Sequence, residues 1–122
     1  MNDFNLKADI SDCYKPFLDI VLKHHQEKMH SVHLVGSALT EDYDPKISDI
    51  NSVMVLQKMD LKFLELLAPL GKKFGKKRVA APLIMTPTYI YNSLDVFPIE
   101  FLNMKLFHQT VFGKDIFQDV KI

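Results

Sequence analysis

The chain has 122 residues, of which 48% are hydrophobic, enough for one globular domain with its own core. Fifteen basic and fifteen acidic side chains cancel, so no overall field attracts nucleic acid or an anionic membrane. No apolar run reaches the roughly 18 residues of a membrane span, residues 1–12 lack a secretion signal, and the lone Cys13 excludes an internal disulfide. We therefore expect a cytoplasmic protein with a single domain over residues 1–122.

The first part of the chain predicts a helix followed by two strands. Apolar residues at helical spacing indicate an amphipathic helix over residues 11–28, capped by Ser11 or Asp12. Residues 31–35 are few and partly β-branched, so we expect a strand there that runs into a turn at Gly36. Residues 50–57 are mostly apolar, as is typical of a strand that is buried on both faces.

A second helix is expected to begin at Asp60, an N-cap residue, and to continue through Leu70. Its buried stripe would consist of Leu61, Leu64, Leu67 and Ala68. Gly71 stands where a C-terminal cap glycine belongs, so the helix should end there.

The rest of the chain predicts further strands around one short helix. Residues 82–86 form a third apolar strand candidate, residues 88–94 a short helix, and residues 99–106, after Pro98, another extended run. The tail carries apolar residues that are typical of the start of another packed element: Ile116, Phe117 and Val120. The pattern as a whole indicates an α+β fold.

The stretch HLVGSALTEDYDPKISDINSVMVL, residues 33–56, holds the residues with the clearest chemistry. Asp49 and Asn51 are two positions apart, so on a strand they project from the same face while Ile50 faces the other side. Gly36 allows a phosphate to approach the backbone, Ser37 adds a hydroxyl, and a helix beginning there would offer free N–H groups. The stretch therefore favours a site for an anion and a metal ion.

This spacing of Gly-Ser and a strand-borne Asp resembles the nucleotidyltransferase superfamily, whose palms are like that of polymerase β. Gly36, Ser37 and Asp49 match the family pattern, and Asn51 replaces the second acid of Asp-x-Asp. The segment PIEFLNMK places Glu100 where a third carboxylate is expected on a later strand, and HQTVFGKDIF is similar to the segment that follows that strand. The resemblance covers about residues 10–122. It implies a mixed β-sheet with helices packed mainly on one face.

The resemblance also implies an activity and the residues that carry it. Asp49 and Glu100 would be catalytic, Gly36 and Ser37 would bind the nucleotide, and Asp49, Asn51 and Glu100 would hold Mg²⁺. The expected reaction transfers a nucleoside monophosphate from a nucleoside triphosphate, with ATP favoured, to an acceptor that the sequence does not identify. Asn51 carries no full negative charge, so the metal site should be weakened.

Several alternatives stay open. A catalytically degenerate module for nucleotide binding, regulation or interaction explains Asn51 equally well, so whether the chain is an enzyme is undecided. The chain is either complete or a fragment that lacks the all-helical domain which commonly follows in the family. A homo-oligomer and a nucleic-acid acceptor are both compatible with the sequence, although neither has support in it.

Other patterns are weaker candidates for a site. The basic run GKKFGKKR, residues 71–78, lacks the spacing of a Walker loop, and its five cations suit either a phosphate backbone or a solvated connection. The histidines at 24, 25, 30 and 33 lack partners at metal-ligand spacing, so we expect ordinary structural roles for them.

Overall fold

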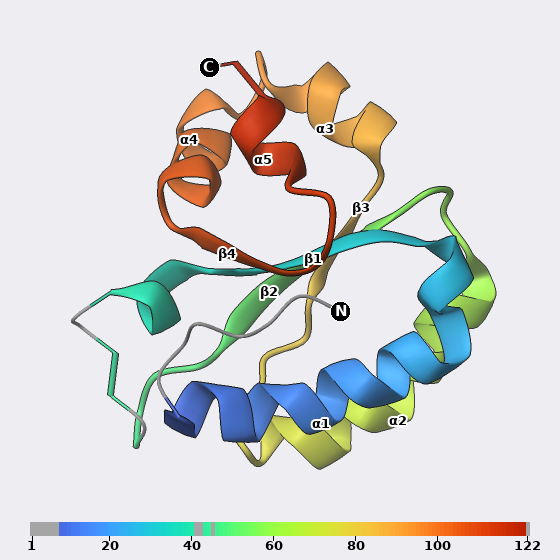
Figure 1. Cartoon of the computed structure of the whole chain (residues 1–122), viewed down its shortest axis with the longest axis vertical. Helices are drawn as coiled ribbons and strands as arrows, with labels where there is room; N and C mark the ends of the chain where they lie inside the picture. Colours follow the sequence, from blue (N-terminus) through green and yellow to red (C-terminus); the bar gives the residue numbers. More distant parts are fainter. Residues whose placement is uncertain (1–7, 41–42, 45, 122) are drawn as a thin grey trace.

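The computed structural model describes residues 8–40, 43–44 and 46–121 (Figure 1). The elements in this part of the chain are α1 (Ala8–His25), η1 (Gln26–Lys28), β1 (Met29–Val35), η2 (Gly36–Leu39), β2 (Asn51–Leu56), α2 (Leu61–Gly75), β3 (Leu83–Met85), α3 (Pro87–Ser93), α4 (Pro98–Leu106), β4 (His108–Gly113) and α5 (Ile116–Asp119), where η denotes a 3-10 helix. Within these ranges no helix combines the length and apolarity that crossing a membrane requires.

Strand β1 lies inside the four-stranded sheet, whose order is β3-β2-β1-β4. It pairs antiparallel with both β2 and β4, whereas β2 and β3 are parallel. The last residue of β1, Val35, lies opposite Asn51 on one side and His108 on the other. The end of β1 and the beginnings of β2 and β4 therefore meet at one end of the sheet.

Helices cover both faces of the sheet (Figure 1). The long helices α1 and α2 pack on one face, around the buried rings of Tyr14, Phe63 and Phe74. The shorter helices α3, α4 and α5 pack on the other face, where Phe101 and Phe117 lie in the core. The predicted α+β class and mixed sheet are confirmed, with the longest helices on one face. The second helical layer was not indicated by the sequence pattern.

Most elements before residue 95 lie close to their predicted positions. The strands at 31–35, 50–57 and 82–86 and the helix at 88–94 are all present within a few residues. Asp60 caps α2 as expected, because its side-chain oxygen accepts a hydrogen bond of 2.9 Å from the Lys62 N–H. The predicted cap of α1 is wrong, since the chain is already helical at Ala8 and residues 11 and 12 lie inside the helix.

The second half of α2 differs from the prediction. The helix continues through Gly71 to Gly75, so Gly71 is not its cap. The predicted stripe is also wrong at three of its four positions, because Leu61 is 78% exposed, Leu64 is 40% exposed and Ala68 is exposed as well. The residues that pack inward are instead spaced by four, three and four: Phe63, Leu67, Leu70 and Phe74. That spacing follows the 3.6-residue period over three turns more closely than the leucine stripe does.

Residues 99–106 form helix α4, so the predicted extended run is wrong. Pro98 occupies the first turn, where its missing N–H costs nothing and its fixed φ favours the helix. Phe101 is buried, while Ile99 is 68% exposed and Leu106 is 63% exposed. Apolar residues therefore lie on both the inner and the outer side of this helix. For this reason the sequence does not show the alternation of apolar and polar residues that is typical of an amphipathic helix.

A buried polar network joins β1 to β4 beneath α5. His33 is completely buried, and its ring nitrogens lie 2.8 Å from the Thr110 hydroxyl and 2.8 Å from the Ser31 hydroxyl. Its ring also packs edge-to-face on Phe117 with a centroid distance of 4.9 Å. Burial lowers the pKa of His33 to about 4, against a smaller opposing effect of the Asp115 charge. The folded protein therefore keeps this imidazole neutral.

This burial makes stability dependent on pH. In the unfolded chain, His33 becomes protonated as the pH falls below its ordinary pKa of about 6.5. In the folded chain it becomes protonated only when the pH falls to about 4. Acidification from about pH 7.5 to about pH 5 should therefore remove about 2 kcal/mol of unfolding free energy through this residue. In urea titrations, His33→Phe should lose this increment, while His24→Gln, at an exposed position, should keep it. An unchanged acid dependence in His33→Phe would contradict the assignment.

Candidate functional site

Gly36 turns the chain at the end of β1 in a backbone conformation that favours glycine. Its φ is +82°, which lies in the left-handed region. A Cβ placed there would lie 3.5 Å from the Asn51 side-chain nitrogen, an ordinary van der Waals contact. The predicted turn at Gly36 is confirmed. The strand pairing thus brings the Gly-Ser turn and the Asp-x-Asn segment into contact.

Asp49 and Asn51 occupy the entry into β2. Both residues are exposed, whereas Ile50 between them is completely buried, which is the alternation of an extended strand. An isolated bridge between Ile50 and Val79 continues the pairing of this segment toward the end of α2. The two polar side chains therefore emerge on the solvent side of the same short stretch.

Arg78 lies beside Asp49 and was not singled out by its position in the sequence. Its guanidinium Nη1 is 3.8 Å from the Asp49 carboxylate, and both side chains are about half exposed, so solvent screens the pair. Arg78 also has a φ of +67°, which is uncommon for a residue with a Cβ. The only advance signal was its place at the end of the basic run 71–78.

The strained backbone of Arg78 is held from two sides. Its carbonyl accepts a hydrogen bond of 2.7 Å from the Ile50 N–H, and its Nη2 donates a hydrogen bond of 2.9 Å to the Lys46 carbonyl. Strain that surrounding contacts maintain often marks a functional position. The arrangement keeps a cation at the solvent side of the Asp49 segment.

Glu100 lies on the first turn of α4 instead of on a strand. The expectation that Glu100 supplies a third carboxylate from a later strand is therefore wrong, because no strand carries it. The neighbours of β2 in the sheet are β1 and β3, and the residues of β3, Leu83, Ile84 and Met85, supply no carboxylate. Glu100 nevertheless lines the same open hollow, of about 440 Å³, as Val35 and Gly36.

The Ser37 side chain and the loop acids Glu41 and Asp42 lie outside the described part of the structure. The backbone after Gly36 forms only η2, a single four-residue turn of 3-10 helix. The expected helix that would point free N–H groups at a phosphate is therefore not present at this turn.

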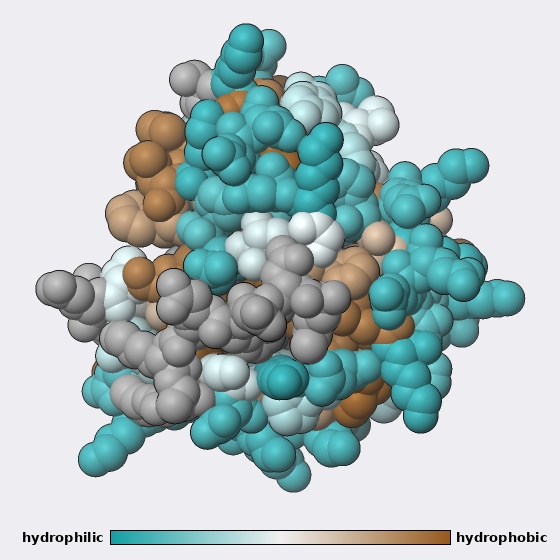
Figure 2. All heavy atoms as spheres, viewed as in Figure 1, coloured by the Kyte–Doolittle hydropathy of each residue, from teal (hydrophilic) through white to brown (hydrophobic). Residues whose placement is uncertain are grey.

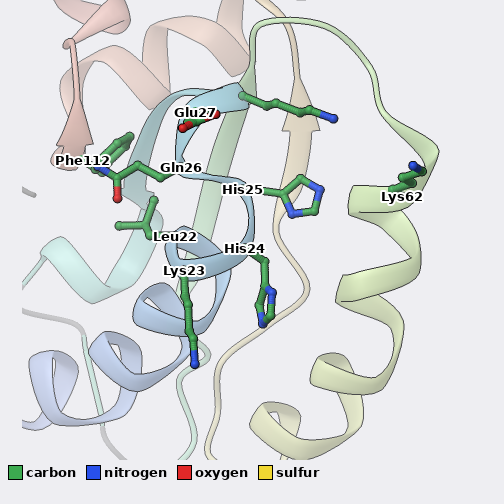
Figure 3. Close-up of a pocket in the computed structure, with 9 residues that line it drawn as sticks. Leu22, Lys23, His24, His25, Gln26, Glu27, Lys62 and Phe112 are labelled. Atoms are coloured by element: carbon green, nitrogen blue, oxygen red, sulfur yellow. The ribbon is translucent and has the colours of Figure 1, made fainter.

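A larger open hollow, of about 820 Å³, lies at the other end of β1. Figure 3 shows that its side chains come from the end of α1, η1, β4 and the beginning of α2. It holds several lysines and two histidines, and Glu27 is its acidic residue. Over the residues that the structure describes, no group of three or more His, Cys, Asp or Glu side chains could hold a metal ion.

Substitutions at Gly36 should separate backbone strain from space. Gly36→Asn should lose little stability because Asn tolerates the left-handed region, whereas Gly36→Ala should lose about 1 kcal/mol. Gly36→Val should lose more and should also weaken the binding of tripolyphosphate with Mg²⁺ severely, because its branched side chain projects toward Asn51. Urea unfolding and calorimetry measure the two effects. Equal tripolyphosphate affinity in wild type and Gly36→Val would remove the phosphate role of this turn.

The similarity of this chain to known proteins lies in its structure. No family model and no curated protein matches it. The fold is similar to a crystal structure of the toxin-antitoxin MntA-HpeT, a mutant in which two aspartates two positions apart are replaced by glutamates. The TM-score is 0.50, the sequence identity is 12%, and the match covers 83% of this chain and 74% of that chain. At this identity the likeness concerns the fold, and the chain has a nucleotidyltransferase-like α+β fold.

Proposed function

We propose that the chain binds a nucleoside triphosphate at the Gly36–Asn51 end of the sheet and transfers a nucleoside monophosphate, weakly, to an acceptor. The observation that carries this proposal is the contact between the left-handed turn at Gly36 and Asn51, with Glu100 on the same hollow as Gly36. The turn leaves room at the backbone for a phosphate, while Arg78 supplies a cation near Asp49. The acceptor is left undefined by these residues.

The side chains at this end of the sheet offer the type of ligand atom that Mg²⁺ prefers, but they carry one negative charge fewer than the family pattern. Carboxylate oxygens from Asp49 and Glu100 and the amide oxygen of Asn51 are the hard ligands that Mg²⁺ takes. Bound Mg²⁺ would neutralise the triphosphate and activate the acceptor hydroxyl. Asn51 withholds one negative charge, and β3 offers no replacement. We therefore expect weak metal binding and slow transfer.

A second candidate is a degenerate module that binds a nucleotide without transferring it. Two observations favour this candidate: the amide at Asn51 and the engagement of Asp49 by the Arg78 guanidinium. Arg78 would then replace a metal as the positive partner of both the carboxylate and the phosphates. Pyrophosphate release separates the two candidates, because only the transferase requires it.

The substitution Asn51→Asp should repair the metal site. It adds a negative charge beside Asp49 with almost no change in side-chain volume, so the variant should bind Mg²⁺ and ATP more tightly than the wild type. In chelator it should be less stable, because the added carboxylate repels its neighbours. Thermal melts with and without Mg²⁺ and ATP measure both effects through binding linkage.

The matched control is Asn51→Ser, which removes the amide oxygen and adds no charge. A gain from Mg²⁺ that is larger in Asn51→Asp than in both the wild type and Asn51→Ser supports the proposal. If all three proteins melt identically in every condition, the likeness to nucleotidyltransferases is one of fold alone.

The substitution Arg78→Gly should affect stability and binding in opposite directions. Glycine adopts the positive φ freely, so the folded protein should be as stable as the wild type or slightly more stable. Loss of the guanidinium should lower the affinity for tripolyphosphate about tenfold, as expected for one charge-assisted hydrogen-bond pair. Lys76→Ala, which removes a neighbouring cation of the same run, is the control and should have little effect. Unchanged affinity in Arg78→Gly would show that Arg78 only pairs with Asp49.

A further inference from the structure

One face of α4 turns toward the end of β1 and forms a wall of the hollow beside Gly36. Glu100, Asn103, Met104 and Phe107 follow each other at the spacing i, i+3, i+4 and i+7, so they share one side of the helix and the residue after it. All four line the hollow of about 440 Å³, and Val35 and Gly36 form its opposite side. The hollow therefore lies directly against the turn that the proposed function assigns to the phosphates.

The chemistry of this wall suits a flat, hydrogen-bonding ring. Phe107 is 47% exposed, so much of its aromatic surface is open to a ligand. Val35 and Met104 add apolar surface, and Met adapts its shape easily to a bound group. The exposed Asn103 amide carries both a donor and an acceptor. A mostly apolar hollow with few polar groups is the usual form of a small-molecule site, and its volume lies within the usual range.

The corner between α4 and β4 holds this wall in place. The Phe107 N–H donates a hydrogen bond of 2.9 Å to the Asn103 carbonyl. The next residue, His108, has one ring nitrogen 2.8 Å from the Lys105 carbonyl and the other 2.7 Å from the Asp115 carboxylate. His108 also pairs with Val35 across the sheet. The end of α4 is thus tied to both β1 and the beginning of α5, which limits its freedom before a ligand binds.

We infer that this hollow is the base-binding subsite of the proposed nucleotide site and that it takes an adenine. The ring would stack on Phe107, and the Asn103 amide would pair with the amino group and the adjacent ring nitrogen of adenine, a bidentate match. Guanine presents two acceptors at the same edge, so its oxygen would face the amide oxygen of Asn103 in that pose. This inference rests on the proposed function, because Gly36 is what joins the base to the phosphates.

The test compares ATP, GTP and tripolyphosphate by calorimetry with the intact chain and Mg²⁺. ATP should bind about tenfold more tightly than tripolyphosphate, and Phe107→Ala should remove roughly that advantage. Phe107→Tyr should keep it. Asn103→Leu, which is nearly isosteric and has no hydrogen-bonding groups, should erase the preference for ATP over GTP. Leu106→Ala, on the outer side of α4, is the control and should leave all three affinities unchanged.

The outcomes separate this inference from the proposed function. Equal affinities for ATP and tripolyphosphate would overturn the base subsite and leave the phosphate site standing. An ATP advantage that survives Phe107→Ala would also overturn it. If tripolyphosphate does not bind, the proposed function fails, and the hollow is then tested with adenosine alone by amide chemical shifts. Shifts confined to the Asn103–Phe107 segment and the Gly36 turn would support the subsite, and their absence would overturn it.

Discussion

The two-sided pairing of β1 is the constraint on which the rest of the structure depends. This strand is hydrogen-bonded to β2 along one edge and to β4 along the other, and helices cover both of its faces. The side chains of such a strand must be apolar, or their polar groups must form hydrogen bonds with other buried groups of the protein. It does both, since Val32 and Leu34 face α1 and α2, while His33 is satisfied by Thr110 and Ser31. The interior position of β1 thus explains why a histidine can be fully buried.

The same pairing places the candidate site. Because Val35 lies opposite both Asn51 and His108, the Gly36 turn emerges where β2 and β4 begin. Helix α4 ends directly before β4, so its last turn is carried to the same corner. Strand register therefore brings together residues that are far apart in the sequence. Asn51 lies on β2 and Glu100 on α4, whereas Asp49 lies in the segment before β2 and Arg78 in the turn after α2.

The sequence predicted the part of the fold that local patterns control. β-branched runs predicted β1 and β2, and the cap chemistry of Asp60 predicted the beginning of α2. It failed for α4, where exposed Ile99 and Leu106 break the link between apolar character and burial, and where only Pro98 signalled a helix. Arg78 could not be predicted, because its approach to Asp49 depends on how the end of α2 returns to β2. Spacing places residues along the chain, whereas such contacts need the tertiary structure.

The pairing of β1 with β4 also governs the order in which the molecule can be completed. His33 and Thr110 are 77 positions apart, so one edge of β1 waits for a partner that is synthesised much later. Until then its hydrogen-bonding groups and the apolar face under α4 and α5 are open to other chains. Contacts between residues so far apart in the sequence form slowly, because the entropy of ordering the long intervening loop is lost before the contacts stabilise the fold. The stretch from His108 to Val120 supplies β4 and part of the core on the second face of the sheet, so a nascent chain that pauses before it would expose an edge strand prone to aggregation.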